Sequence, residues 1–89
     1  MVSTENLPMK YVYLLRSLSS QQETYIGITN DLNDRLKEHN SGKSSHTAKN
    51  VPWEVEVAIR FTDDKRATAF ERHLKSGSGH AFANRHLWS

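Results

Sequence analysis

Apolar side chains alternate with other residues along positions 53–61, and this pattern constrains the fold more than any other feature of the chain. The apolar members, at every second position, are Trp53, Val55, Val57, Ile59 and Phe61. Successive side chains of a strand point to opposite faces of its sheet, so this spacing predicts a strand with one buried and one wet face. The chain must therefore build a sheet whose apolar face is covered by another layer.

Two earlier segments, residues 11–15 and 24–28, are rich in aromatic and branched side chains and predict a β-hairpin across a polar loop. Alternation groups the aliphatic residues of both strands on one face. This core-facing set would be Val12, Leu14, Ile26 and Ile28. Tyr13 and Tyr25 would then emerge together on the opposite face.

A first helix is predicted over residues 31–40, with Thr29 or Asn30 as its N-cap. Its apolar side chains, Leu32 and Leu36, recur at helical spacing, and His39 falls on the same face. Arg35 lies beside this face. The helix therefore brings one histidine and one arginine close to its apolar stripe.

A second helix is predicted after Thr62, which can cap it, and the serine and glycine residues 76–79 end it. A short third helix is expected over about residues 80–87. Glu71 borders the apolar stripe of the second helix. A carboxylate in that position is costly unless something pairs with it, so Glu71 is a candidate functional residue.

The element order is β-β-α-β-α-α, which predicts an α+β fold: a three-stranded antiparallel sheet with helices packed on its apolar face and the first strand at its centre. Residues 10–89 are expected to form a single domain and residues 1–9 a flexible leader. The 89 residues include no cysteine, which excludes a disulfide framework, a cysteine zinc site and a thiolate nucleophile. No apolar run could span a membrane and no signal peptide is evident, so a cytoplasmic protein is expected.

The charge pattern is compatible with a polyanionic partner. The formal net charge is +2, and no aspartate or glutamate follows Glu71, whereas arginine, lysine and histidine do. A second basic stretch extends from Lys37 to Lys49. For any single residue, solvated surface is an equally good explanation, but two basic stretches flanking an acidic segment favour a phosphate-facing side.

Arg35, Glu71, Tyr13 and Tyr25 would make a site for phosphate chemistry if they converged on one sheet surface. An arginine grips phosphate oxygens, a carboxylate holds a hard cation, and a phenol beside both could lose its proton more easily than in water. The alternatives are that Arg35 and Glu71 form only an ion pair and that the tyrosines are ordinary strand residues.

Tyr11-Val12-Tyr13 followed by Tyr25-Ile26-Gly27 resembles the paired motif of the GIY-YIG nuclease superfamily. The first motif reads Tyr-Val-Tyr here instead of Gly-Ile-Tyr. The resemblance continues in order through Arg35 and residues 39–42 to Glu71 and Lys75. The chain is similar to the small single-domain bacterial members of this superfamily, which are related to the nuclease domain of the excision-repair protein UvrC.

The resemblance implies a role for each matching residue. Tyr13 and Tyr25 match the motif tyrosines, of which one is the general base on the attacking water and the other positions it. Arg35 matches the arginine that stabilises the phosphorane-like transition state. Glu71 matches the only protein ligand of one Mg²⁺ or Mn²⁺ ion. Substrate phosphate and water complete the coordination of that ion. His39 matches a histidine that assists the base in some members.

The resemblance further implies a metal-dependent endonuclease that acts on DNA, in repair or in processing of structured or single-stranded DNA. Lys43, Lys75 and Asn84 are expected to contact the nucleic acid. Many relatives carry an attached DNA-targeting domain, so a protein partner is expected to supply targeting here. The alternatives are a module of the same fold that binds nucleic acid without cutting it, and a structural domain with no nucleic-acid partner.

Overall fold

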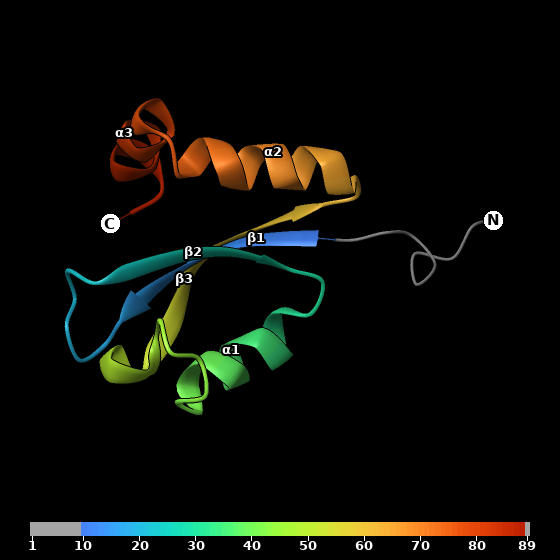
Figure 1. Cartoon of the computed structure of the whole chain (residues 1–89). Coiled ribbons are helices and arrows are strands. Elements are labelled where there is room, and N and C mark those ends of the chain that lie inside the picture. The colour runs from blue at the N-terminus through green and yellow to red at the C-terminus, as the bar shows by residue number, and fades with distance from the viewer. Residues whose placement is uncertain (1–9, 89) are drawn as a thin grey trace.

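The computed structural model describes residues 10–88 and contains a three-stranded antiparallel sheet of order β2-β1-β3. The strands are β1 (Lys10–Ser17), β2 (Thr24–Thr29) and β3 (Trp53–Phe61). β1 lies at the centre and β2 at an edge (Figure 1). The α+β fold class and the central position of the first strand are thereby confirmed. The predicted leader, residues 1–9, lies outside the described residues.

Helices cover both faces of the sheet, whereas the sequence predicted one wet face. Figure 1 shows α1 (Leu32–Asn40) on one side and α2 (Asp64–Leu74) with α3 (Gly77–His86) on the other. Each face accordingly has its own core. The core on the α2 side is built on the buried residues Val12, Leu14, Ala67, Leu74 and Ala83. The core on the α1 side is built on Tyr13, Leu15 and Trp53.

A β-bulge in β3 explains why the prediction of one buried face for residues 53–61 is wrong. Leu14 of β1 pairs with Val57, but the next residue, Leu15, pairs with Val55. Glu56 is therefore an extra residue in the register of β3 against β1, and it reverses the alternation of β3. Val57 packs with the α2-side core, whereas Val55 and Trp53 belong to the α1-side core. The bulge lets one strand supply apolar side chains to both layers.

The hairpin faces are as predicted. Val12 and Leu14 of β1 lie in the α2-side core, and Ile26 and Ile28 pack against them. Tyr13 belongs to the opposite core, where Tyr25 packs against it. Strict period-two alternation in two short antiparallel strands is sufficient to place the tyrosines together.

Both predicted N-caps of the first two helices are wrong by one or two residues. Asp31, not Thr29 or Asn30, caps α1, because its carboxylate accepts a hydrogen bond from the backbone N–H of Asp34 at 3.0 Å. Asp63, not Thr62, caps α2 in the same way, accepting from the N–H of Lys65 at 2.9 Å. The ionised aspartates also interact favourably with the positive helix N-terminus, which a threonine hydroxyl does less well.

Residues 76–79 begin α3 instead of forming a separate connection, which moves the start of the third helix forward from the predicted residue 80. Ser76 is the N-cap, and its hydroxyl accepts from the N–H of Gly79 at 3.3 Å. A side chain at Gly79 would overlap the backbone carbonyl of His73. Glycine is therefore required here for α3 to pack closely against the end of α2.

Candidate active site

Tyr13 and Tyr25 come together because Gly27 leaves room for them. Tyr13 pairs directly with Gly27 across the β1–β2 ladder, so both face the same side of the sheet. A methyl group on Gly27 would overlap the Tyr13 hydroxyl and would lie 2.9 Å from Cε1 of Tyr25. The two tyrosine rings have their centroids 6.2 Å apart. The glycine thus allows the Tyr13 phenol to extend across β2, toward the edge of the sheet.

His39 joins the two tyrosines from α1. Its side chain is buried, and its Nε2 lies 3.0 Å from the Tyr13 hydroxyl. Its ring centroid lies 4.8 Å from that of Tyr25. The prediction that His39 shares a face with the leucines of this helix agrees with the structure, because Leu32 and Leu36 pack against the α1-side core. A tyrosine–histidine–tyrosine cluster therefore lies between β1, β2 and α1.

Thr47 is a further member of this cluster, and the sequence-based reasoning missed it. Its hydroxyl lies 2.9 Å from Nδ1 of His39, and the residue is fully buried. Its carbonyl accepts a hydrogen bond from the Trp53 indole at 2.9 Å. Thr47 lies in the polar segment between α1 and β3, just before η2 (Ala48–Asn50), where no periodic pattern distinguishes it. Only the folded loop brings it to His39.

The environment keeps both Tyr13 and His39 neutral. Burial raises the pKa of Tyr13 well above its usual range, and the neighbouring Tyr25 raises it further. The carboxylates of Glu71 and Glu38 act in the same direction, whereas the Arg35 guanidinium lowers the pKa of Tyr13. Burial, followed by the Arg35 charge, also lowers the pKa of His39. The arginine alone is therefore insufficient to make the Tyr13 phenol more acidic than in water.

Arg35 is close enough to Tyr13 and His39 for its charge to act on both, yet 43% of its side chain is exposed. Its Nη1 lies 3.3 Å from a carboxylate oxygen of Glu38, one helical turn along α1. The alternative that Arg35 and Glu71 pair with each other is therefore wrong. Glu71 pairs with Lys75, and Arg35 pairs loosely with Glu38 at the surface. Such a pair competes weakly with phosphate for the guanidinium.

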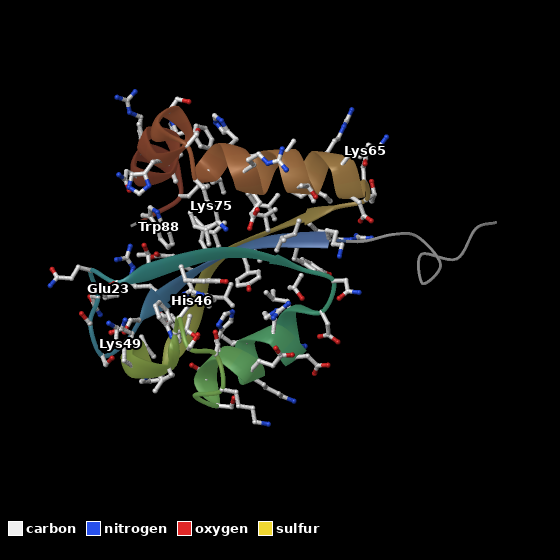
Figure 2. The ribbon with its side chains drawn as sticks, in the orientation of Figure 1. Glu23, His46, Lys49, Lys65, Lys75 and Trp88 are labelled. Atoms are coloured by element: carbon white, nitrogen blue, oxygen red, sulfur yellow. The ribbon has the colours of Figure 1, made fainter. Side chains whose placement is uncertain are left out.

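Glu71 reaches the site from the opposite layer, which corrects the expectation that all four key residues share one sheet surface. It belongs to α2, and Figure 2 shows Lys75 of the same helix on the other side of the sheet from His46. The Glu71 carboxylate pairs with the Lys75 ammonium at 2.9 Å and is 17% exposed. Its charge nevertheless acts on Tyr13. A site that included both Glu71 and Tyr13 would therefore involve both layers of the fold.

The donor chemistry fits a metal ion held by few protein ligands. Residues 10–88 contain no cluster of three or more histidine, cysteine, aspartate or glutamate side chains able to enclose a metal. Mg²⁺ binds one or two carboxylates and retains several waters, so the single half-buried Glu71 is sufficient when substrate phosphate completes the coordination. Lys75 would have to move away from Glu71 for a metal to bind there.

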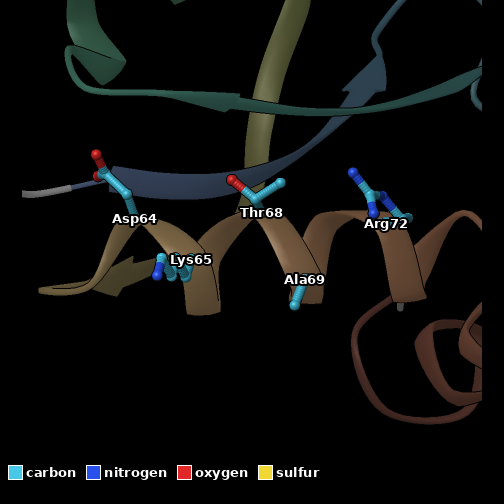
Figure 3. A pocket seen from close by; sticks show the side chains of 5 residues that line it. All are labelled: Asp64, Lys65, Thr68, Ala69 and Arg72. Carbon is cyan, nitrogen blue, oxygen red and sulfur yellow. The ribbon is translucent and has the colours of Figure 1, made fainter.

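The other predicted contacts with nucleic acid lie at the surface. Lys43 is exposed in the loop after α1, and Asn84 is exposed on α3. Within the part of the chain that the structure describes, the side chain of neither residue forms a hydrogen bond or ion pair with the tyrosine–histidine cluster. A separate hollow of about 290 Å³ lies along an exposed part of α2 and contains none of the predicted site residues (Figure 3). It is lined by Asp64, Lys65, Thr68, Ala69 and Arg72.

None of the helices between residues 10 and 88 is both long enough and apolar enough to cross a membrane.

Comparison with known proteins identifies similar sequences. The sequence model of the GIY-YIG catalytic domain matches residues 9–84. The chain is 35% identical over 83 aligned residues to the structure-specific endonuclease subunit SLX1 of Candida dubliniensis, covering 85% of this chain and 28% of that protein. It therefore spans just over a quarter of the length of that relative. It is also 36% identical over 66 residues to the UPF0213 protein OB0043 of Oceanobacillus iheyensis, covering 73% of this chain and 74% of that protein.

A solved structure supports the fold. The solution NMR structure of the UPF0213 protein BH0048 from Bacillus halodurans superposes with a TM-score of 0.52 at 25% sequence identity. The superposition covers 89% of this chain and 86% of that one. The three-stranded sheet with its helices is therefore shared with a protein of similar size.

Proposed function

The chain belongs to the family of the GIY-YIG catalytic domain, and from that premise we propose that it is an endonuclease that hydrolyses phosphodiester bonds of DNA with one divalent metal ion. The family match implies a nuclease domain and a nucleic-acid substrate, and such nucleases typically use a divalent metal. The observation that carries the proposal is the hydrogen bond between the Tyr13 hydroxyl and His39 Nε2, beside the charges of Arg35 and Glu71.

Tyr13 and His39 act together as the general base in this proposal. The raised pKa of Tyr13 opposes a free phenolate, but a neutral phenol can accept a proton while it gives up its own. The attacking water transfers a proton to the Tyr13 oxygen, and the Tyr13 proton passes to Nε2 of His39. The water oxygen then forms its bond to phosphorus as the phosphorus–oxygen bond to the leaving strand breaks, and the leaving oxygen takes up a proton from solvent. His39 is suited to receive the proton because burial lowers its pKa and keeps it neutral.

The remaining residues hold the substrate and the developing charge. Arg35 donates hydrogen bonds to the phosphate oxygens as negative charge builds up on them. Tyr25, packed against His39, positions the attacking water. Glu71 would hold Mg²⁺ or Mn²⁺, which would supply positive charge to stabilise the leaving oxygen. Lys75, released from Glu71, then contacts the DNA backbone, and Lys43 and Asn84 contact it at the periphery.

The choice of DNA rests on the resemblance to the nuclease domain of the excision-repair protein UvrC. One relative is named as a structure-specific endonuclease subunit, which favours structured or single-stranded DNA as the preferred substrate. A protein partner that directs the domain to its target remains part of the proposal.

The test is cleavage of supercoiled plasmid and of single-stranded and branched oligonucleotides with Mg²⁺ or Mn²⁺, against EDTA. Tyr13→Phe keeps the ring in the core and removes the hydroxyl, so cleavage should fall to the EDTA background. Tyr11→Phe, on the same strand and the same face, is the matched control and should cleave like the unaltered protein. Cleavage that persists in EDTA or in Tyr13→Phe would contradict the proposal.

A binding module that does not cut is the second candidate, and the Lys75–Glu71 ion pair favours it, because the ammonium occupies the proposed metal ligand. DNA binding of normal strength without cleavage under any metal would support this alternative.

A further inference from the structure

Both ring nitrogens of His39 have partners, and the second partner is Thr47. Nε2 lies 3.0 Å from the Tyr13 hydroxyl and Nδ1 lies 2.9 Å from the Thr47 hydroxyl. Tyr13, His39 and Thr47 are each buried, with Thr47 fully so. A neutral imidazole carries one N–H and one lone pair, so the two hydrogen bonds must run in the same direction along the ring.

Two arrangements of the protons are possible, and only one suits the proposed proton transfer. In the first, Nδ1–H donates to Thr47 and the Tyr13 O–H donates to Nε2. In the second, Thr47 donates to Nδ1 and Nε2–H donates to Tyr13, which leaves no lone pair on Nε2 to receive the Tyr13 proton. The oxygen lone pair of a phenol is partly delocalised into the ring, so a phenol is a stronger donor and a weaker acceptor than an aliphatic hydroxyl. The first arrangement is therefore favoured.

Thr47 is held in place to serve as this acceptor. Its N–H donates to the carbonyl of Ser44 at 3.2 Å, and its own carbonyl accepts from Asn50 and from the Trp53 indole. Trp53 is in turn fixed by Asn40 at the end of α1, whose side-chain amide bonds both the N–H and the carbonyl of Trp53. The loop, the strand and the helix that carries His39 thus form one hydrogen-bonded unit.

We propose that Thr47 is a positioning residue that accepts the Nδ1–H of His39 and thereby keeps Nε2 free to take a proton from Tyr13. The catalytic consequence rests on the proposed function, whereas the protonation pattern of His39 does not. If Thr47 had only a structural role, its buried hydroxyl would need a hydrogen-bond partner but would not determine which ring nitrogen of His39 carries the proton. Its removal would then lower stability and leave the protons of His39 where they were.

Nitrogen-15 NMR of the histidine ring tests the pattern directly, in the full chain at neutral pH without metal or DNA. His39→Gln identifies the signals. The unaltered protein and Thr47→Ser should both carry the proton on Nδ1. Thr47→Val, which keeps the shape and removes the acceptor, should shift His39 toward the Nε2–H form. Finding mainly Nε2–H in the unaltered protein, or no change in Thr47→Val, would overturn the inference.

Thr29 provides a matched control. It is also buried, and its hydroxyl bonds the backbone of Asp31 without contacting His39. Thr29→Val should lose stability to a similar degree as Thr47→Val and leave the ring protons of His39 unchanged. If Thr47→Val does not fold, the ring pattern of the unaltered protein and Thr47→Ser still decides the question.

Kinetics separate this inference from the proposed function. Thr47→Val should lower kcat about tenfold or more with KM unchanged, and Thr47→Ser should restore it, because the wrong tautomer impairs proton transfer and not substrate binding. An unaltered kcat in Thr47→Val would overturn the positioning role. If the unaltered protein cleaves nothing, the proposed function fails, while the NMR result still decides whether Thr47 sets the proton position.

Discussion

The two faces of the sheet are built from different chemistry, although the same three strands contribute to both. On the α2 side, the buried residues of the core are aliphatic, and Phe61, Phe70 and Trp88 pack against them as partly buried side chains. On the α1 side, the core contains Tyr13, Trp53 and His39, joined through Thr47 by hydrogen bonds. Buried polar networks require each partner to be satisfied, so they fix side-chain positions more tightly than aliphatic packing does. The α1 side is suited to position reacting groups and the α2 side to support them.

Glu71 is the exception that connects the two sides. It belongs to the helix over the aliphatic core, yet its charge acts on Tyr13. The proposed metal ligand and the proposed general base lie in different layers, so each can be changed separately. The comparison between the faces can therefore be tested by substitutions that affect one side at a time.

The largest effect is expected for Glu71→Gln, which keeps the shape and removes the charge that would hold the metal. Cleavage should fall to the level seen in EDTA, whereas the fold and most DNA binding should remain. Plasmid nicking and fluorescence anisotropy with labelled DNA measure the two properties. Glu23→Gln, in the exposed loop of the hairpin, is the matched control (Figure 2). Near-normal cleavage by Glu71→Gln would show that the carboxylate serves only as the structural partner of Lys75.

Arg35→Ala should lower the cleavage rate by about 10²–10³-fold, because one well-placed donor to a developing negative charge is typically worth that much. Its exposed ion pair with Glu38 contributes at most about 1 kcal/mol, so the midpoint of urea unfolding should hardly move. Lys37→Ala, on the same helix and exposed, controls for general charge loss. If unfolding shifts strongly and the rate of the folded protein does not, Arg35 has a structural role.

Three glycine substitutions compare the two sides directly. Gly27→Ala should displace the Tyr13 hydroxyl from His39, reducing cleavage at least tenfold and stability by about 1–3 kcal/mol. Gly79→Ala should destabilise more, because its methyl group meets the rigid backbone carbonyl of His73. Apart from its chain neighbours and the backbone of its own helix, a methyl group on Gly77 would have no heavy atom within 4 Å, so Gly77→Ala should change stability by less than about 1 kcal/mol.

Thermal and urea unfolding, together with the cleavage rate of the folded fraction, measure these three variants. Equal loss of cleavage in Gly27→Ala and Gly79→Ala, after correction for the folded fraction, would contradict the inference that the α1 side positions the reacting groups and the α2 side only supports them.

The sequence predicted the features that depend on local periodicity. The hairpin, the face shared by Tyr13 and Tyr25, and the position of His39 on the apolar side of α1 follow from repeats of two or 3.6 residues. The ordered motif likewise predicted the family. These features involve short segments in which neighbouring residues determine the geometry.

The features that the sequence did not predict depend on contacts between distant segments. The bulge at Glu56 arises from the register of β3 against β1, and the pattern of β3 alone indicates continuous alternation. Thr47 reaches His39 only because the loop after α1 folds against Trp53. The layer from which Glu71 approaches depends on the course of the chain after β3, which no local pattern specifies.

The smallest effect is expected from pH, and it concerns His39. Burial lowers the pKa of His39 from its ordinary value of 6.5, so the unfolded chain takes up a proton at a higher pH than the folded one does. Below about pH 6.5, the unfolded state therefore binds more protons, and stability falls as the pH falls. This contribution is fully present above pH 6.5 and is lost as the pH drops through the lowered pKa of the folded state. One proton contributes at most about 1.4 kcal/mol per pH unit.

Urea unfolding between pH 7.5 and 5 measures this contribution as a difference between variants. His39→Gln should show a shallower loss of stability on acidification than the unaltered protein, because glutamine does not titrate. His80→Gln, exposed on α3, should follow the unaltered protein. Parallel curves for His39→Gln and the unaltered protein would mean that the α1-side core accommodates a charged imidazole. The neutral Tyr13–His39–Thr47 arrangement of the resting protein opposes that charge, since protonated Nε2 cannot accept from Tyr13.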